Sequence, residues 1–205
     1  MFCLCFPVTI KHRKNAINEL KAEAREYMQS LHPWQQELKN ILDQAIDPSC
    51  IYWVVDTSGN TGKTTFMKMY RRLNAENTIL LSGTVNNMRT QAAKMPMRRT
   101  VFLDLPRYMC KTNENGQIDH YVSYKSLRDI KTGNFENDMN FSDRDCHLVI
   151  FANFVPKPNL IEWDRWRICF IDCCTNSWVI KKFECDQDTT APEPDWIEKL
   201  VPEYL

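Results

Sequence analysis

Ile51 to Thr65 of this chain read IYWVVDTSGNTGKTT, and this stretch decides the fold. It begins with an apolar, β-branched run, continues through a loop of small residues, and reaches Gly62, Lys63 and Thr64 at a point where a helix can start. A strand, a small-residue loop and a helix N-terminus in this order surround phosphate groups with backbone N–H donors. The stretch therefore predicts a strand over 51–55, a helix over about 63–73 and a nucleoside triphosphate site between them.

The residue types in this loop indicate the role of each position. We expect Lys63 to reach the β and γ phosphate oxygens of ATP, and the Thr64 hydroxyl to ligate Mg²⁺. The other residues expected to hold the nucleotide are Gly59, Asn60, Thr61, Gly62 and Thr65. The usual spacing, G-x-x-x-x-G-K-[ST], has a glycine where this chain has Thr57. The backbone angles of Thr57 therefore decide whether the loop closes as predicted.

Strand-like and helical segments alternate along the rest of the chain. The pattern predicts strands over 78–81, 100–105 and 147–152, and helices over about 84–94 and 121–130. RICFID and SWVIKKF, near the C-terminus, indicate an edge hairpin or an extension of the sheet. Alternation of this kind predicts an α/β fold with three αβα layers and a mostly parallel central sheet.

Two helices are expected before the first strand. Residues 12–30 are charged and carry apolar residues at helical spacing, and Pro33 opens a second helical segment, WQQELKNILDQAI, after a break. The basic cluster KHRK at 11–14 fits either the solvated start of the first helix or a weak nuclear signal.

Composition limits the classes of function. The chain has 205 residues, of which 43% are hydrophobic, and 26 basic residues balance 26 acidic ones. No overall charge therefore attracts nucleic acid, and a polyanion site must come from a local patch or from several subunits. The longest apolar stretch, MFCLCFPVTI, is too short to span a bilayer, and KHRK follows it, whereas a secretory signal has its basic residues first.

The cysteines favour an intracellular setting. The nine cysteines include no C-x-x-C pair, which is typical of reduced, mostly buried thiols. A metal site at Cys3 and Cys5, or at Cys169 and Cys173, lacks a second pair at suitable spacing.

Two later strands end in polar residues that suit the same site. The strand-like run TVFLDL has Asp104 near its end, and this carboxylate can hold Mg²⁺ together with Thr64. HLVIFA leads to Asn153, whose amide suits contact with the γ-phosphate or the attacking water, or the capping of a turn. The carboxyl ends of parallel strands meet at one sheet edge. Lys63, Asp104 and Asn153 together therefore predict a catalytic site for ATP hydrolysis.

These motifs, in their order and spacing, resemble one family. WQQEL, WVVDTSGNTGKTT, FLDLPR, VIFANFVP and Asp164-Arg165-Trp166 resemble the superfamily 3 helicase domain of replication-initiator (Rep) proteins of circular single-stranded DNA viruses, most of all the nanovirus-like branch. The resemblance covers about Pro33 to about Phe170. It implies a P-loop NTPase fold of AAA+-like type, a ring that is usually a hexamer, and ATP-driven movement along single-stranded DNA, typically 3′ to 5′.

The resemblance also assigns residues. It implies motif A at Gly62 to Thr64, motif B at Asp104, the motif C sensor at Asn153, and a catalytic arginine finger at Arg165. An arginine finger stabilises charge on a neighbouring subunit's nucleotide, so hydrolysis would depend on assembly. The other interpretation of Arg165 is a buried structural arginine. Leu105 follows Asp104 where a second acid would be useful, so the general base stays unassigned.

A DNA-contacting element lies between motifs B and C in that family. The candidates here are Lys125, Arg128, Lys131 and Phe135. A positive loop with an aromatic residue suits a DNA backbone, but solvated lysines at a helix end give the same pattern. Met139 and Asn140 stand where related proteins often have Lys-Tyr, so this chain departs from the family pattern at the DNA-contacting element.

The resemblance leads to a division of the chain and to expected partners. We expect an N-terminal helical oligomerisation segment at 1–48, the ATPase domain at 49–185 and a C-terminal tail at 186–205. The partners would be further copies of the chain and single-stranded DNA, with no membrane, in the host nucleus if the protein is viral. The chain has no H-x-H motif, so we expect it neither to nick nor to join DNA, and a separate nicking domain is a possible partner. The alternatives are a superfamily 3 ATPase that remodels RNA or protein, and a non-hydrolysing nucleotide-binding assembly module.

Overall fold

A computed structural model describes residues 10–96, 98–106, 110–112, 118–120, 124–133, 135, 145–156, 166–172 and 174–182. The helices are α1 (Ile10–Tyr27), α2 (Pro33–Asp43), α3 (Lys63–Leu73), α4 (Val85–Ala93) and α5 (Tyr124–Thr132). The strands are β1 (Ile51–Val55), β2 (Thr78–Ser82), β3 (Thr100–Asp104), β4 (Cys110–Thr112), β5 (Ile118–His120), β6 (His147–Ala152), β7 (Trp166–Ile171) and β8 (Trp178–Lys182).

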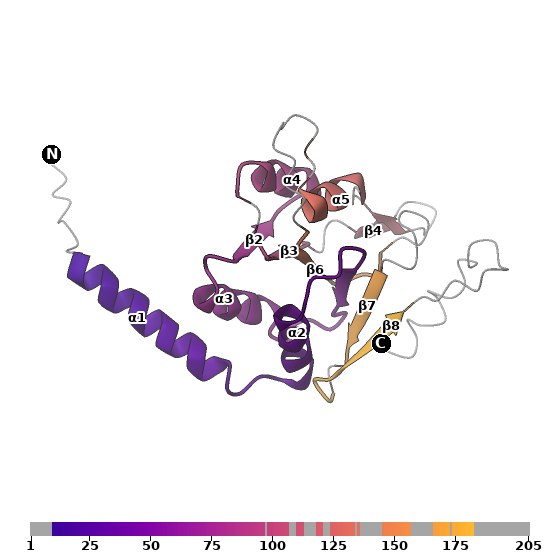
Figure 1. Cartoon of the computed structure of the whole chain (residues 1–205). Coiled ribbons are helices and arrows are strands. Elements are labelled where there is room, and N and C mark those ends of the chain that lie inside the picture. Colours follow the sequence, from indigo (N-terminus) through magenta and orange to yellow (C-terminus); the bar gives the residue numbers. More distant parts are fainter. Residues whose placement is uncertain are drawn as a thin grey trace, which may run out of the picture.

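The central sheet has the strand order β2-β3-β6-β1-β7-β8. The pairs β2–β3, β3–β6, β6–β1 and β1–β7 are parallel, and only the β7–β8 pair of this sheet is antiparallel. Each strand that follows a helix returns to the same sheet, which is why the sheet is parallel. The predicted α/β fold with three layers is confirmed, as is the C-terminal hairpin extending the sheet (Figure 1).

Helices α2 and α3 cover one face of the sheet. Trp34, Leu38 and Leu42 of α2 and Phe66, Met67 and Tyr70 of α3 pack on Val54, Phe102, Val149, Phe151, Cys169 and Ile171 of the strands. The aromatic rings meet at angles, with 5.8 Å between the ring centres of Trp34 and Phe66 and 5.6 Å between those of Tyr70 and Phe102. Burial of these large apolar side chains holds the two helices against the sheet.

Helices α4 and α5 cover the opposite face (Figure 1). Met88 of α4 and Leu127 and Ile130 of α5 pack on the alternate residues of the strands, such as Trp53 and Ile150. Because β1, β3 and β6 are covered on both sides, they are apolar at nearly every position, which explains their continuous hydrophobic runs in the sequence.

Helix α1 packs on α3 with its C-terminal half. Ala24 is fully buried, and Glu23 accepts a 2.7 Å salt bridge from Arg72 of α3. Further toward the N-terminus Ile17 and Leu20 are exposed, and this part of α1 extends away from the sheet in Figure 1. Its expected role in oligomerisation stays a prediction.

Helix α2 packs in the core layer on the sheet, and the expected division of the chain at residue 48 stays a prediction. Two features differ from the sequence-based expectations. Helix α1 begins and ends before the expected limits of 12 and 30, and α5 begins and ends later than expected. The short antiparallel hairpin of β4 and β5 was not expected, since its strands have three residues each and carry no apolar run.

Three cysteines of the described part of the chain, Cys50, Cys146 and Cys169, are buried free thiols. No helix in that part of the chain is both long enough and apolar enough to cross a bilayer.

The packing of α2 can be tested by truncating its buried face. Leu38 is fully buried, and Leu38→Ala should lower the free energy of unfolding by roughly 2–5 kcal/mol because it leaves a cavity in the core. The adjacent Lys39→Ala removes only an exposed pair with Asp43 and should cost under about 0.5 kcal/mol. Urea denaturation of both variants measures the difference. Equal effects would contradict the docking of α2 on the sheet.

Candidate nucleotide-binding site

The carboxyl ends of three adjacent strands form the site. Strand β6 lies between β1 and β3, with Val55 opposite Ala152 and Asp104 opposite Phe151. The backbone N–H of Asp56 donates to the Ala152 carbonyl at 3.0 Å, which carries the ladder one residue past β1. The loop after β1, the end of β3 and the residue after β6 therefore lie side by side at one edge. This is the edge where ligands bind in open α/β sheets.

The loop closes through left-handed residues at three positions. Gly59, Asn60 and Gly62 have φ values of 80°, 63° and 87°, and Thr57 has no positive φ. A side chain is therefore tolerated at Thr57, because the left-handed turn has moved to the glycine two places later. The departure from the usual glycine spacing leaves the loop intact.

Gly62 is fixed by a second constraint, the side chain of Gln35 on α2. A Cβ atom at Gly62 would lie 2.9 Å from the Gln35 Nε2, closer than atoms can pack. Gln35 is 1% exposed, and its Oε1 accepts from the His32 N–H at 3.1 Å. Helix α2 therefore packs against the loop at Gly62, the residue that caps the N-terminus of α3.

Asp56, the residue after β1, organises the loop from inside. Its carboxylate is fully buried and accepts from the Gly59 N–H at 2.7 Å and the Ser58 hydroxyl at 3.1 Å. The same carboxylate accepts from the Thr61 hydroxyl at 2.7 Å and forms a salt bridge with Lys63. Burial raises the pKa of Asp56, but the hydrogen bonds from Lys63, Thr61 and Gly59 outweigh burial and lower the pKa below its ordinary value.

Asp104 and Asn153 lie beside this loop as predicted from their strand ends. Burial raises the pKa of Asp104, while Lys63 and Lys68 pull it down in part, so the net pKa is above the ordinary value. The Asn153 side-chain amide donates to the backbone carbonyl of Asp56. The structure therefore brings Lys63, Asp104 and Asn153 to one place.

The residues present suit a nucleotide with Mg²⁺. Helix α3 begins at Lys63 and has no acidic residue in its first turn, so its N-terminus favours an anion. Thr64 and Thr65 are exposed in that turn, with hydroxyls suited to Mg²⁺ and to phosphate oxygens. The carboxylate of Asp104, at the end of β3, would supply a second hard oxygen ligand for Mg²⁺. Among the described residues no three His, Cys, Asp or Glu side chains gather into a metal site.

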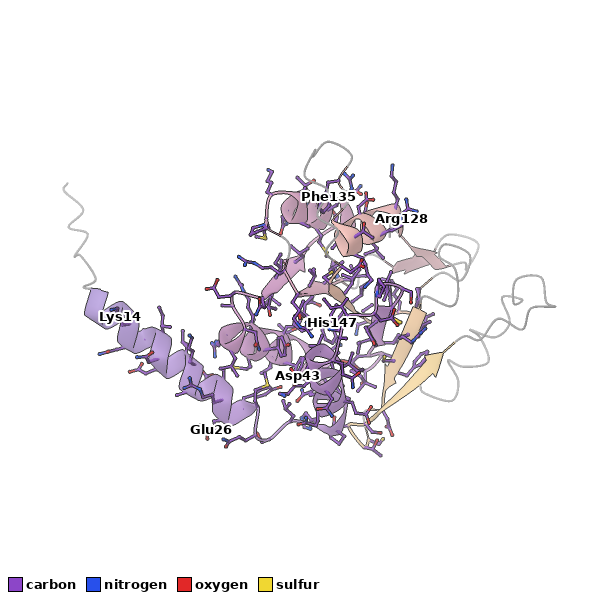
Figure 2. All side chains as sticks on the ribbon, in the orientation of Figure 1. Lys14, Glu26, Asp43, Arg128, Phe135 and His147 are labelled. Atoms are coloured by element: carbon purple, nitrogen blue, oxygen red, sulfur yellow. The ribbon has the colours of Figure 1, made fainter. Side chains whose placement is uncertain are left out.

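The candidate nucleic-acid residues separate into different environments. Lys125 and Arg128 are exposed on α5, and Figure 2 shows Arg128 and Phe135 on the side of the molecule opposite Asp43 of α2. Lys131 is only 3% exposed, and its ammonium donates to the carbonyls of Asp47 at 2.9 Å and Cys146 at 2.7 Å. The prediction of a nucleic-acid contact is therefore wrong for Lys131, which ties α5 to the start of the sheet.

Phe135 lies partly buried against the core, with the Arg89 guanidinium 5.8 Å from the centre of its ring. Arg89 also forms a 2.7 Å salt bridge with Asp129 of α5. Arg89 and Asp129 border a cavity of about 280 Å³ between α4 and α5, lined by Asn86, Arg89, Thr90, Lys125, Ser126 and Asp129.

Three residues differ in how the sequence-based prediction relates to the structure. Arg165, the expected arginine finger, lies outside the described residues. Asp56 and Gln35 were not assigned a role from the sequence. An acid at the end of the strand that leads into a phosphate loop was a usable signal for Asp56, whereas nothing local to WQQEL indicates that Gln35 reaches Gly62.

The opposite pKa shifts of the two carboxylates predict opposite effects on stability. The folded pKa of Asp104 is raised, so its charged form opposes folding at pH 7, and the folded protein gains stability as the pH falls toward that pKa. Asp104→Asn should therefore be more stable than the wild type at pH 7, with a difference that shrinks in acid.

For Asp56 the sign is reversed. Its folded pKa is lowered, so it contributes stability above its unfolded pKa, and this contribution is lost as the pH falls through the folded pKa. Asp56→Asn should be less stable than the wild type at pH 7. Urea denaturation of both variants from pH 7 to pH 3 measures the effects, and shifts of the same sign would contradict the two environments.

Comparison with known proteins relates the chain to viral replication-associated proteins. Para-Rep C1 of Faba bean necrotic yellows C11 alphasatellite is 30% identical over 149 residues, which cover 70% of this chain and 48% of that protein. Para-Rep C6 of Subterranean clover stunt C6 alphasatellite is 27% identical over 149 residues, with coverage of 70% and 48%. Para-Rep C10 of Milk vetch dwarf C10 alphasatellite is 27% identical over 154 residues, with coverage of 72% and 51%.

This chain spans about half the length of the curated relatives it matches. No family model matches it. No solved structure matches it either. The relatives are Rep proteins by name, so the chain is similar to proteins of viral DNA replication over most of its length.

Proposed function

We propose that this chain is an ATP-dependent DNA helicase of superfamily 3 that acts in rolling-circle replication. It would hydrolyse ATP between the subunits of a ring, assembled as a hexamer in the way the resemblance implies, and move 3′ to 5′ on single-stranded DNA. The observation that carries the proposal is the meeting of Lys63, Asp104 and Asn153 at the carboxyl edge of adjacent strands. The similarity to Para-Rep proteins supports a role in replication.

The proposed roles follow from the chemistry of the side chains. ATP bound with Mg²⁺ supplies a phosphoanhydride bond whose hydrolysis releases free energy. Lys63 would neutralise phosphate charge, and the loop N–H groups would orient the phosphates at the start of α3. Thr64 and Asp104 would hold Mg²⁺, and Asn153 would orient the attacking water or the terminal phosphate.

The general base and the finger complete the proposed machinery. Leu105 is buried and follows Asp104, so no second carboxylate stands at that position, and we assign no general base. Arg165 is proposed as the finger that a neighbouring subunit provides, which would make the site complete only between two copies of the chain.

Strand displacement tests the activity and its direction. The wild type with ATP and Mg²⁺ should unwind a duplex with a 3′ single-stranded tail and leave a 5′-tailed duplex intact. Lys63→Ala should lower ATP hydrolysis by about 100-fold or more, because the phosphate charge loses its partner. Lys21→Ala, which removes an exposed lysine on α1, is the control.

The outcomes separate the possible functions. Hydrolysis without unwinding of either DNA would contradict a helicase and favour a substrate of RNA or protein. No hydrolysis by the wild type, even with DNA added, would favour a nucleotide-binding assembly module.

DNA contact by α5 can be measured through salt dependence. Lys125 and Arg128 are exposed on this helix, and their joint replacement by alanine should weaken binding of single-stranded DNA. If each contacts one phosphate, the slope of log K against log salt should fall by about 1.4. Lys21→Ala with Arg25→Ala removes the same charge from α1 and is the control. An unchanged slope in the α5 variant would refute this contact.

A further inference from the structure

We propose that Asp56 is a positioning residue that competes with the nucleotide phosphates for Lys63. The inference rests on the proposed nucleotide site and adds a residue to it. In this account the Asp56 carboxylate holds Lys63 before a nucleoside diphosphate or triphosphate binds. The polyphosphate must then take Lys63 away from Asp56, so that Asp56 sets the nucleotide affinity.

The contacts of Asp56 resemble those that a phosphate group needs. One carboxylate oxygen accepts from Lys63 and the Thr61 hydroxyl, and the other accepts from the Gly59 N–H and the Ser58 hydroxyl. An ammonium, a backbone N–H and hydroxyls are the donors that a phosphate loop offers to its ligand. A negatively charged group from the chain itself therefore already uses donors of the loop.

Burial strengthens the competition. The Asp56 side chain is fully buried, and that of Lys63 is 12% exposed, so water screens their attraction little. Polyphosphate bound to Lys63 would also place negative charge near the carboxylate, which costs further free energy. The attraction between Asp56 and Lys63 and the repulsion between Asp56 and the polyphosphate both weaken nucleotide binding, compared with a loop that has a neutral residue at position 56.

Comparison with two other aspartates shows what is particular to Asp56. Asp47 accepts from the N–H and hydroxyl of Ser49 and from Cys50, and Asp172 accepts from the Cys174 N–H and the Thr175 hydroxyl. These contacts are those of ordinary turns. Asp56 caps its loop in the same way but also pairs with a lysine that the nucleotide needs. The hydrogen bonds that Asp56 accepts from Ser58 and Gly59 explain the shape of the loop. Its ion pair with Lys63 is the contact that we propose to affect nucleotide affinity.

Asp56→Asn separates the two roles, because asparagine keeps an oxygen acceptor for the Gly59 N–H and removes the charge. Calorimetric titration with Mg-ADP and with inorganic pyrophosphate should give about tenfold tighter binding in Asp56→Asn than in the wild type. Asp172→Asn makes the same change at an ordinary turn and should bind like the wild type. In a Lys63→Ala background the Asp56→Asn effect should shrink, because the competition for Lys63 is gone and only the repulsion between the carboxylate and the phosphates remains.

The outcomes distinguish this inference from the proposed function. Wild-type protein that binds neither ligand would overturn the proposed function and this inference with it. Binding by the wild type with equal or weaker binding by a folded Asp56→Asn would overturn this inference alone.

A second measurement covers the case in which Asp56→Asn does not fold. In wild-type protein labelled with ¹³C at the aspartate carboxyl groups, the Asp56 resonance should move when pyrophosphate is added at pH 7, because the carboxylate loses Lys63. The Asp172 resonance should stay in place. An Asp56 resonance that stays unchanged while pyrophosphate binds would overturn the inference.

Discussion

The salt bridge between Lys63 and the buried carboxylate of Asp56 is the interaction around which the site is arranged. It joins the end of β1 to the first residue of α3, and the hydrogen bonds from Ser58, Gly59 and Thr61 to the same carboxylate fold the loop between them. A buried charge is tolerated only when it is paired and hydrogen-bonded, so the loop cannot open without a large cost. The loop is thereby held in the form that presents the N-terminus of α3.

The fold brings other groups to this loop through strand order. Because β6 lies between β1 and β3, Asp104 and Asn153 reach the loop from strands that are far apart in the sequence. The Asn153 amide binds the Asp56 carbonyl, so the proposed sensor and the loop share one hydrogen bond. Behind the loop, α2 packs into the aromatic layer of the core and places Gln35 against Gly62. A change at the site is therefore coupled to the packing of α2 and α3 on the sheet.

The parts of the fold that depend on local pattern were predictable from the sequence. Buried parallel strands are apolar throughout, so β1, β3 and β6 were found within one residue of their limits, and the start of α3 followed from Gly62 and Lys63. The environment of a single side chain was not predictable, because it depends on tertiary packing. The sequence around Lys131 is typical of a surface lysine, but its ammonium is buried between two carbonyls. The sequence around Gln35 is typical of an ordinary helix residue, but the side chain is buried. For Asp56, the position at the end of a strand that leads into the phosphate loop could be recognised in the sequence. Its salt bridge with Lys63 could not.

The central claim is that residues 56–64 hold a polyphosphate at the start of α3, and a crystal structure with Mg²⁺ and a non-hydrolysable ATP analogue tests it most directly. We predict that the triphosphate lies in this loop, with Lys63 turned from Asp56 to the phosphates and Mg²⁺ between Thr64 and Asp104. A nucleotide bound elsewhere on the chain, or an ordered crystal in which Lys63 stays on Asp56 at saturating analogue, would contradict the account.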